Sequence, residues 1–257
     1  MFSMTSVKTL LIALLCFACG VLPLQAQSDS QAAYQNYRKA VGLLNQKNYD
    51  EASEAAAKAA QLAPKSAEIQ QRCAEILYRS GKTKKSLPLF DRANELSPEI
   101  APHNWQRGIA LGSAGLWKQG AAQFKSHHDV NPDDVENSAW YFLCVAKSKG
   151  LADAEKTVIP SRGDGRQPMM SILQMLKKEI KPAEVVTAAK TNTREGYARK
   201  NALFYADLYL GLYYDSLNDE SNAIKYLKRS MTHGVEGYMA DTARVYYNDR
   251  FATKSDK

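Results

Sequence analysis

The densest group of chemically reactive side chains lies in one short stretch of the sequence. Its members are His127, His128, Asp129, Asp133, Asp134 and Glu136. Imidazole and carboxylate groups bind zinc, so a metal-dependent enzyme around His127 and His128 is one hypothesis. Adjacent residues of a helix, however, point about 100° apart. We therefore favour another interpretation, in which this stretch ends one helix and Asp133 or Asp134 caps the next.

Other motifs for catalysis are missing from the sequence. It contains no HExxH, GxSxG or P-loop pattern. The tripeptide Arg162-Gly163-Asp164 resembles a short adhesion motif, but a glycine in a loop explains it equally well. Four tyrosines at helical spacing are expected to pack between helices, namely Tyr209, Tyr213, Tyr214 and Tyr226. We therefore predict no enzyme, no catalytic residue, no bound metal and no cofactor.

Prolines reveal the elements that must position these side chains. Pro64, Pro98 and Pro132 are 34 residues apart, which is the period of the tetratricopeptide repeat (TPR). With each proline at position 32 of its repeat, small residues fall where two helices cross, and glycine or phenylalanine falls at other fixed positions. These residues are Ala52, Ser86 and Gly120 at position 20, Gly81 and Gly115 at position 15, and Phe90 and Phe124 at position 24. On these residues the sequence resembles the TPR superfamily over residues 33–134.

The fold that follows from this pattern is all-α. Each repeat would be a pair of antiparallel helices, which cannot bury its apolar face alone and must stack on its neighbours. A glycine at position 15 would end the first helix in a left-handed cap, and the proline would stop the second helix. We therefore predict TPR helix-turn-helix repeats stacked into a right-handed superhelix, an α-solenoid.

Five segments are expected along the chain. Residues 1–26 would be a signal peptide, and residues 27–159 would hold three repeats and a fourth, degenerate one that starts at Val135. Residues 160–200 contain clustered prolines and glycines and would form an irregular, partly helical connector. A further repeat and a capping helix are predicted over residues 201–251, followed by a tail from residue 252 to residue 257.

The first 26 residues have the order of a secretory signal. Lys8 is followed by an uncharged stretch from Leu10 to Leu22 and by the small residue Ala26. This predicts export across the inner membrane and a periplasmic location. Cys16 and Cys19 are poor matches to a lipidation signal, so lipoprotein anchoring is the less favoured alternative. The other two cysteines, Cys73 and Cys144, fall on apolar helix faces and are expected to be small core residues.

Charge gives weaker information about partners. The formal net charge is +7, but the basic residues are spread over the whole chain. Without a dense block of Lys and Arg among aromatic residues, we do not expect nucleic-acid binding. A mild positive charge in an envelope compartment would favour anionic polymers, so a peptidoglycan- or glycan-binding module is a further alternative.

The second half is also similar to a narrower group, the bacterial envelope lipoprotein NlpI and its relatives. The similar segments are residues 107–111 (RGIAL), residues 131–134 (NPDD) and residues 209–214 (YLGLYY). The resemblance implies an adaptor of the cell envelope that holds peptidoglycan enzymes and a protease and that tends to dimerise. The poor lipidation cysteine departs from this group and leaves the membrane tether open.

Binding residues are expected on the first helix of each repeat, which lines the concave side of a TPR stack. Aromatic residues and arginine dominate the energetics of protein interfaces. The predicted groove residues are Tyr34, Tyr37, Gln71, Glu75, Tyr78, Arg79 and Trp105. We predict that this groove binds an unidentified protein or peptide partner, and that the chain works as a scaffold or adaptor.

Overall fold

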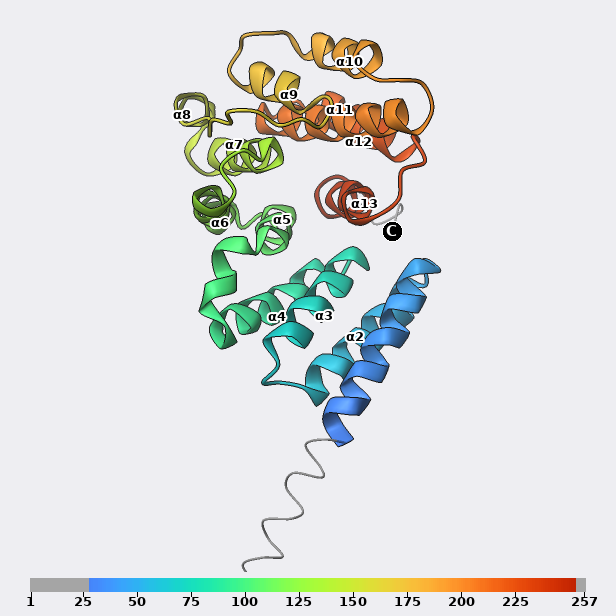
Figure 1. Cartoon of the computed structure of the whole chain (residues 1–257). Coiled ribbons are helices and arrows are strands. Elements are labelled where there is room, and N and C mark those ends of the chain that lie inside the picture. The colour runs from blue at the N-terminus through green and yellow to red at the C-terminus, as the bar shows by residue number, and fades with distance from the viewer. Residues whose placement is uncertain (1–27, 253–257) are drawn as a thin grey trace, which may run out of the picture.

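The computed structural model describes residues 28–252, and every regular element within this range is a helix. The helices pack as antiparallel pairs that follow one another from the N-terminal helices at one end of the stack to α9 (Met169–Leu176) and α10 (Pro182–Thr191) at the other (Figure 1). The predicted all-α solenoid is thus confirmed. The predicted signal peptide over residues 1–26 lies outside the described residues.

The first three helix pairs follow the proline period. Residues 28–45 pair with α2 (Tyr49–Leu62), α3 (Ala67–Arg79) pairs with α4 (Thr83–Leu96), and α5 (Trp105–Ser113) pairs with α6 (Trp117–Val130). A 3-10 helix, η1 (Pro98–His103), leads into α5. The second helix of each pair ends two residues before a proline, namely Pro64, Pro98 or Pro132, because proline cannot continue the hydrogen-bonding pattern.

The remaining helices depart from the regular repeat. A long helix, α7 (Val135–Lys149), is followed by the short α8 (Leu151–Lys156) and by a loop over residues 157–168. Next come α9 (Met169–Leu176), α10 (Pro182–Thr191), α11 (Tyr197–Ser216), α12 (Glu220–Met231) and α13 (Tyr238–Arg250). Helix α11 starts well before Phe204, where the repeat pattern returns, because its first turns pack against α10 and α9 and bury Ala202.

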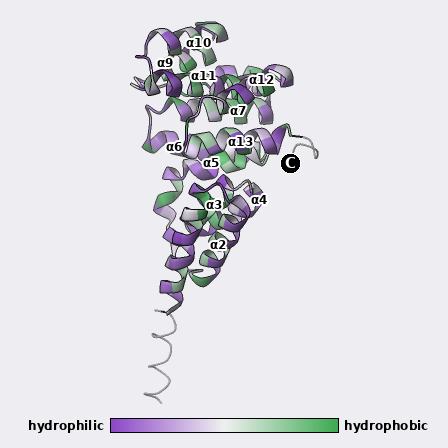
Figure 2. Cartoon of the chain, turned by 90° about the vertical axis from the view of Figure 1, so that its right-hand side faces the viewer, coloured by the Kyte–Doolittle hydropathy of each residue, from purple (hydrophilic) through white to green (hydrophobic). Residues whose placement is uncertain are grey.

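Two groups of buried side chains form the core. The larger group extends from α3 to α13 and includes Trp140, Tyr209 and Tyr246. The smaller group is rich in alanine and joins the first helix pair to α3. Hydrophobic and hydrophilic residues alternate around the same helices (Figure 2), as expected for helices that each bury one face. Within residues 28–252, no helix is both long and apolar enough to cross a membrane.

Glycines allow helices to approach at three positions. A Cβ atom on Gly108 would lie 2.7 Å from Phe124, one on Gly120 would lie 2.8 Å from the Cys144 sulfur, and one on Gly211 would lie 2.6 Å from Leu227. These distances are shorter than real Cβ contacts. The helices can therefore approach this closely only because these three residues are glycines. At Gly115, by contrast, a φ of +76° in the turn between α5 and α6 favours glycine.

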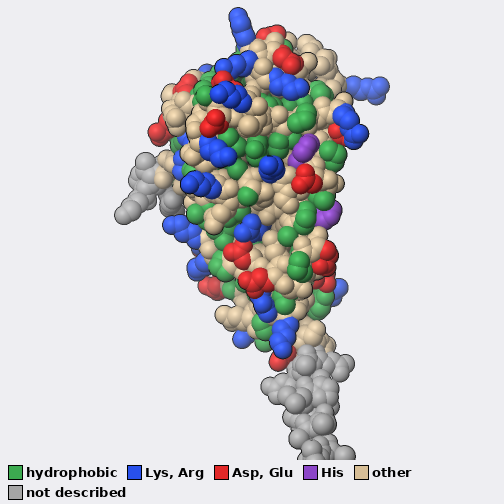
Figure 3. Space-filling model, turned by 90° about the vertical axis from the view of Figure 1, so that its left-hand side faces the viewer, with side chains coloured by type: hydrophobic (Ala, Val, Ile, Leu, Met, Phe, Trp, Pro, Cys, Tyr) green, Lys and Arg blue, Asp and Glu red, His purple; other side chains and the backbone are tan. Residues whose placement is uncertain are grey.

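The C-terminal helix does not extend the stack. Helix α13 covers α12 and also turns back to contact α3 and α5 (Figure 1). The face of the molecule on the side away from α13 carries Lys and Arg side chains among acidic and hydrophobic ones (Figure 3). The path of α13 determines which part of the concave side stays open to solvent.

We expect Gly120→Ala to destabilise the protein by about 1–3 kcal/mol, because the new methyl group would overlap the Cys144 sulfur. The cost should be smaller in a Cys144→Ala background, where the sulfur is gone. Urea unfolding followed by circular dichroism measures both values. Gly42→Ala is the matched control, because Gly42 also lies within a helix and an added Cβ there meets nothing within 4 Å. An equal cost of Gly120→Ala in both backgrounds would contradict the packing argument.

Candidate functional site

The concave side of α3 and α5 is filled by α13. The ring of Tyr238 stacks on Tyr78 with a centroid distance of 5.9 Å and meets the edge of Trp105 at 5.0 Å. The Arg79 guanidinium lies 5.8 Å from the centre of the Tyr238 ring. Tyr78 is fully buried as a result. An intramolecular helix thus occupies the place where a bound helix of a partner would be expected to lie.

Polar contacts fix the same helix along its length. Arg79 Nε donates a hydrogen bond of 2.8 Å to Asp241, and Arg244 donates to the backbone carbonyl of Arg79. The Thr83 hydroxyl donates to Asp249 at 2.5 Å. The Arg79–Asp241 pair is partly buried, so salt screens it less than an exposed pair. Specific hydrogen bonds therefore fix the position of α13, in addition to the packing of its side chains.

The C-terminal turns of α13 contact α11 and α6. The Tyr246 hydroxyl donates to Asp215, whose carboxylate also lies 2.6 Å from Lys147 Nζ. The Arg250 guanidinium lies 4.9 Å from the Trp117 ring centre. Burial is the main reason why the pKa of Tyr246 is raised well above its usual value. Tyr246 thus stays protonated and keeps donating over the whole physiological range.

Three of the seven predicted groove residues, Tyr78, Arg79 and Trp105, contact α13. A partner could reach the fully buried Tyr78 only after α13 had moved away, whereas Arg79 and Trp105 stay partly exposed beside α13. The sequence did not indicate that α13 packs on the concave side, because the segment has the pattern of a partly polar helix. The aromatic residues Tyr238 and Tyr246 were the only signal that it buries one face. Whether any of the seven residues binds a partner stays a prediction.

The other four predicted residues lie beyond α13, on a surface that we call the open concave face: Tyr34, Tyr37, Gln71 and Glu75, with their neighbours Glu68 and Arg72. The Tyr34 hydroxyl donates to Glu68 at 3.0 Å. The Arg72 guanidinium lies 5.8 Å from the Tyr37 ring centre. These contacts link the first helix of the chain to α3.

Hydrogen bonds continue along this face to the third helix pair. Gln71 Nε2 lies 2.9 Å from Glu75 Oε1 and 3.1 Å from Asn104 Oδ1. A shallow pocket of about 620 Å³ lies over these residues and extends to His103. Burial raises the pKa of Glu75 above its usual value. The open concave face is therefore polar, with tyrosine rings at its outer end.

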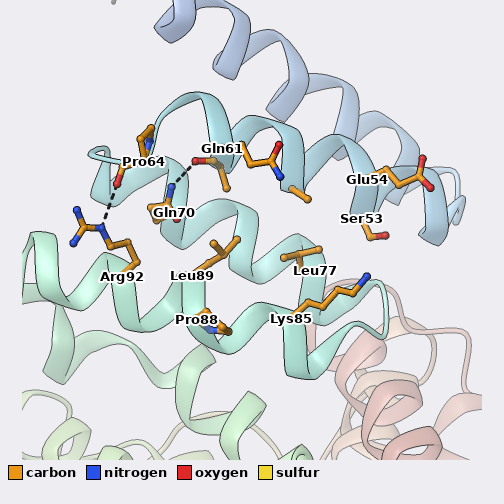
Figure 4. A pocket seen from close by; sticks show the side chains of 12 residues that line it. Ser53, Glu54, Gln61, Pro64, Gln70, Leu77, Lys85, Pro88, Leu89 and Arg92 are labelled. Atoms are coloured by element: carbon orange, nitrogen blue, oxygen red, sulfur yellow. Dashed lines mark hydrogen bonds between the residues drawn. The ribbon is translucent and has the colours of Figure 1, made fainter.

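A second depression lies on the outer side of the stack, between α2 and α4 (Figure 4). Its volume is about 540 Å³, and Leu77, Pro88 and Leu89 supply much of its apolar lining. Gln70 Nε2 donates to the carbonyl of Ala60 at 2.8 Å, and Arg92 Nε donates to the carbonyl of Pro64 at 3.3 Å. These hydrogen bonds hold the helices around one end of the groove. None of the predicted groove residues lies there.

The histidine cluster is built as a helix junction. His127 is buried, with Nδ1 2.9 Å from the carbonyl oxygen of Pro102 and Nε2 3.4 Å from the Asn131 amide. Asp134 Oδ1 accepts the backbone N–H of Glu136 at 3.1 Å, so the predicted cap at the start of α7 is confirmed. In the described part of the chain, no group of three or more His, Cys, Asp or Glu side chains could hold a metal ion.

A charged cluster beside this junction joins the loop after α8 to α7. Arg166 donates to three carboxylates, those of Asp134, Glu136 and Asp164. Glu136 also accepts a hydrogen bond from the Tyr209 hydroxyl. Burial raises the pKa of Glu136 to about 7, although Arg166 and Tyr209 act in the opposite direction. One guanidinium shared by three carboxylates explains why this loop is held in place.

Both cysteines of the described chain are buried and free, as predicted for core residues. Burial raises the pKa of Cys73 to about 12 and that of Cys144 further. Because the thiolate is the nucleophilic form, neither thiol is suited to catalysis at neutral pH.

We expect Tyr238→Ala to loosen α13, because the variant removes the ring that packs between Tyr78, Arg79 and Trp105. Truncation of a fully buried aromatic residue costs about 3–5 kcal/mol, and the half-buried Tyr238 should cost less. Hydrogen–deuterium exchange should become faster over residues 238–250 while α10 keeps its protection. Tyr197→Ala is the control, since that side chain is 70% exposed. Unchanged protection of α13 would show that other contacts hold it.

Stability should also depend on the ionisation of Glu136. Its pKa rises from 4.5 to about 7 on folding, so the folded state binds the proton more tightly than the unfolded state. The free energy of unfolding should therefore fall as pH rises from about 4.5 to 7, by up to about 3 kcal/mol. Glu136→Gln should flatten this part of the profile, measured by urea unfolding at several pH values. The exposed Glu51→Gln should leave it unchanged, and equal profiles for all three proteins would refute the assignment.

Comparison with protein families agrees with the helix pairs. A family model described as a tetratricopeptide repeat matches residues 43–106, which contain α2, α3 and α4 and reach the start of α5. Stacks of such repeats form extended concave surfaces that bind other proteins. The proline period, the helix pairs and this match agree on tetratricopeptide-type helix pairs over residues 43–106, within an all-α solenoid.

Proposed function

We propose that the protein is an extracytoplasmic scaffold that binds polypeptide partners on its open concave face. The observation that carries this proposal is the division of the concave side. Helix α13 covers Tyr78, Arg79 and Trp105, whereas Tyr34 is 43% exposed and the pocket over Gln71 and Glu75 stays open. The uncovered part is where a partner can bind without any rearrangement.

The chemistry of this face suits an extended polypeptide. Gln71 and Glu75 carry amide and carboxylate groups that can bond to main-chain N–H and C=O groups. Tyr34 and Tyr37 supply rigid aromatic surface at the outer end, and such residues often contribute strongly to binding. The face spans three helix pairs, so several residues of a bound segment could be contacted at once.

The location and partner class rest on the sequence. The signal-like start and the similarity to the NlpI group support a role in the cell envelope, including the assembly of peptidoglycan enzymes. The poor fit of Cys16 and Cys19 to a lipidation signal favours a periplasmic protein without a lipid anchor. A homodimer is a further expectation from the same resemblance. A metal-dependent enzyme around His127 is less favoured, because His127 is buried and bonded to Pro102 and Asn131.

The proposal is tested with a photo-reactive amino acid placed at single positions in cells. Incorporation at Gln71 or Glu75 should give a defined cross-linked product with a partner protein. Incorporation at the exposed Lys58, on α2, serves as the control. Tyr37→Ala combined with Gln71→Ala should reduce the cross-link from position 75 by about tenfold or more while the circular dichroism spectrum stays unchanged. Equal cross-linking from position 58, or an undiminished product in the double variant, would overturn the proposal.

A further inference from the structure

The depression on the outer side of the stack, which we call the outer groove, lies between two helices that make few direct contacts with each other. Helices α2 and α4 form its walls, each packs on α3, and Leu77 of α3 lies in its floor (Figure 4). Tyr34, Tyr37, Gln71 and Glu75 do not line it. The outer groove is therefore separate from the open concave face.

The next groove along the stack, between α4 and α6, shows how the chain can close such a gap. Arg107 of α5 donates to Asp91 of α4 at 2.7 Å and to Gln123 of α6 at 3.1 Å, so one side chain joins the two walls. The residues 34 positions earlier, one repeat back, are uncharged: Cys73, Ala57 and Leu89. They cannot form this bridge, so the outer groove stays open and largely apolar.

One face of α4 gives the outer groove a basic edge with an apolar centre. Lys85, Pro88, Leu89 and Arg92 all line the groove, and residues at this spacing lie on one side of a helix. The two basic residues are seven positions apart, which is about 10 Å along the helix axis. Pro88 and Leu89 lie between them. The edge therefore presents two positive charges in a fixed register.

Both basic residues can accept an acidic partner. In the described part of the chain, no hydrogen bond or ion pair involves the Lys85 side chain. Arg92 pairs with Glu95 and with the carbonyl of Pro64, but the pair with Glu95 is exposed and such pairs contribute little. The guanidinium also has further N–H donors.

The surrounding charges favour acidic groups along α4 only. The first turn of α4 contains Lys84 and Lys85 and no acidic residue, and the positive end of the helix dipole lies there. On the opposite wall, α2 contributes Glu54, the one acidic residue among those that line the groove. A bound segment should therefore carry its acidic groups on the edge that faces α4.

A helix fits this surface better than an extended segment. The main-chain groups of α2 and α4 are mostly hydrogen-bonded within their own helices, so they offer few partners to the N–H and C=O groups of a strand. A helix pairs its own main-chain groups and can pack its side chains into the space between two other helices.

We propose that the outer groove is a docking site for an amphipathic helix of a partner protein, in which two acidic residues seven positions apart flank an apolar pair. The acidic residues pair with Lys85 and Arg92. The apolar residues, at the third and fourth positions after the first acid, pack on Pro88, Leu89 and Leu77. This spacing matches the basic and apolar pattern of α4 itself.

Two synthetic peptides of about 16 residues, each held helical by a hydrocarbon staple, test this register. The first has glutamates seven positions apart, with leucines at the third and fourth positions between them. In the second, the later glutamate is moved two positions further, which places it on the opposite side of the helix without changing the composition. Fluorescence anisotropy of the labelled peptides measures binding to the protein. We expect the first peptide to bind about fivefold more tightly or better.

Variants locate the binding site on the protein. Lys85→Glu should weaken binding of the first peptide by about fivefold or more, and it removes no side-chain contact of the folded chain. Lys84→Glu is the matched control, because Lys84 is the neighbouring exposed lysine of α4 but does not line the outer groove. A third peptide with lysines in place of both glutamates should prefer the double variant Lys85→Glu with Arg92→Glu over the unaltered protein.

Three results would overturn the proposal. The first is that neither glutamate peptide binds, or that both bind equally. The second is that the lysine peptide binds the unaltered protein as tightly as the first peptide does. The third is that Lys84→Glu weakens binding as much as Lys85→Glu, which would indicate a general attraction to basic residues. Cross-linking from positions 71 and 75 is independent of these results, so the two proposals fail separately.

Discussion

The packing of Tyr238 between Tyr78, Arg79 and Trp105 is the contact on which the rest of the arrangement depends. It brings the last helix of the chain onto the concave side of α3 and α5. From there α13 reaches Asp215 and Trp117 through Tyr246 and Arg250. One helix therefore joins the regular N-terminal repeats to the less regular C-terminal half, and it divides the concave side into a filled part and an open part.

Each part has its own chemistry. The open concave face is polar and carries Gln71 and Glu75, which are hydrogen-bonded to each other. A small pocket beside α13 is lined by aromatic side chains together with the charged Asp134, Glu136 and Arg166.

Much of the fold could be predicted because it depends on local signals. Prolines at a fixed interval, a glycine such as Gly115 with positive φ, and Asp134 as a helix cap act within a few residues of the chain. The position of α13 could not be predicted in this way. It depends on contacts between residues such as Arg79 and Asp241, which are 162 positions apart. The groove residues were chosen from repeat positions, which do not reveal that the same chain covers some of them.

The return of α13 has a consequence for how the chain folds. A linear solenoid has mainly nearest-neighbour contacts, so its repeats can form and melt one after another. Contacts between residues as far apart as Thr83 and Asp249 raise the contact order, because a long loop must close before they form. The first repeats can form early, but closure must wait for the final residues of the described chain. A solenoid closed in this way should unfold more nearly as a single cooperative unit than an open array of the same length.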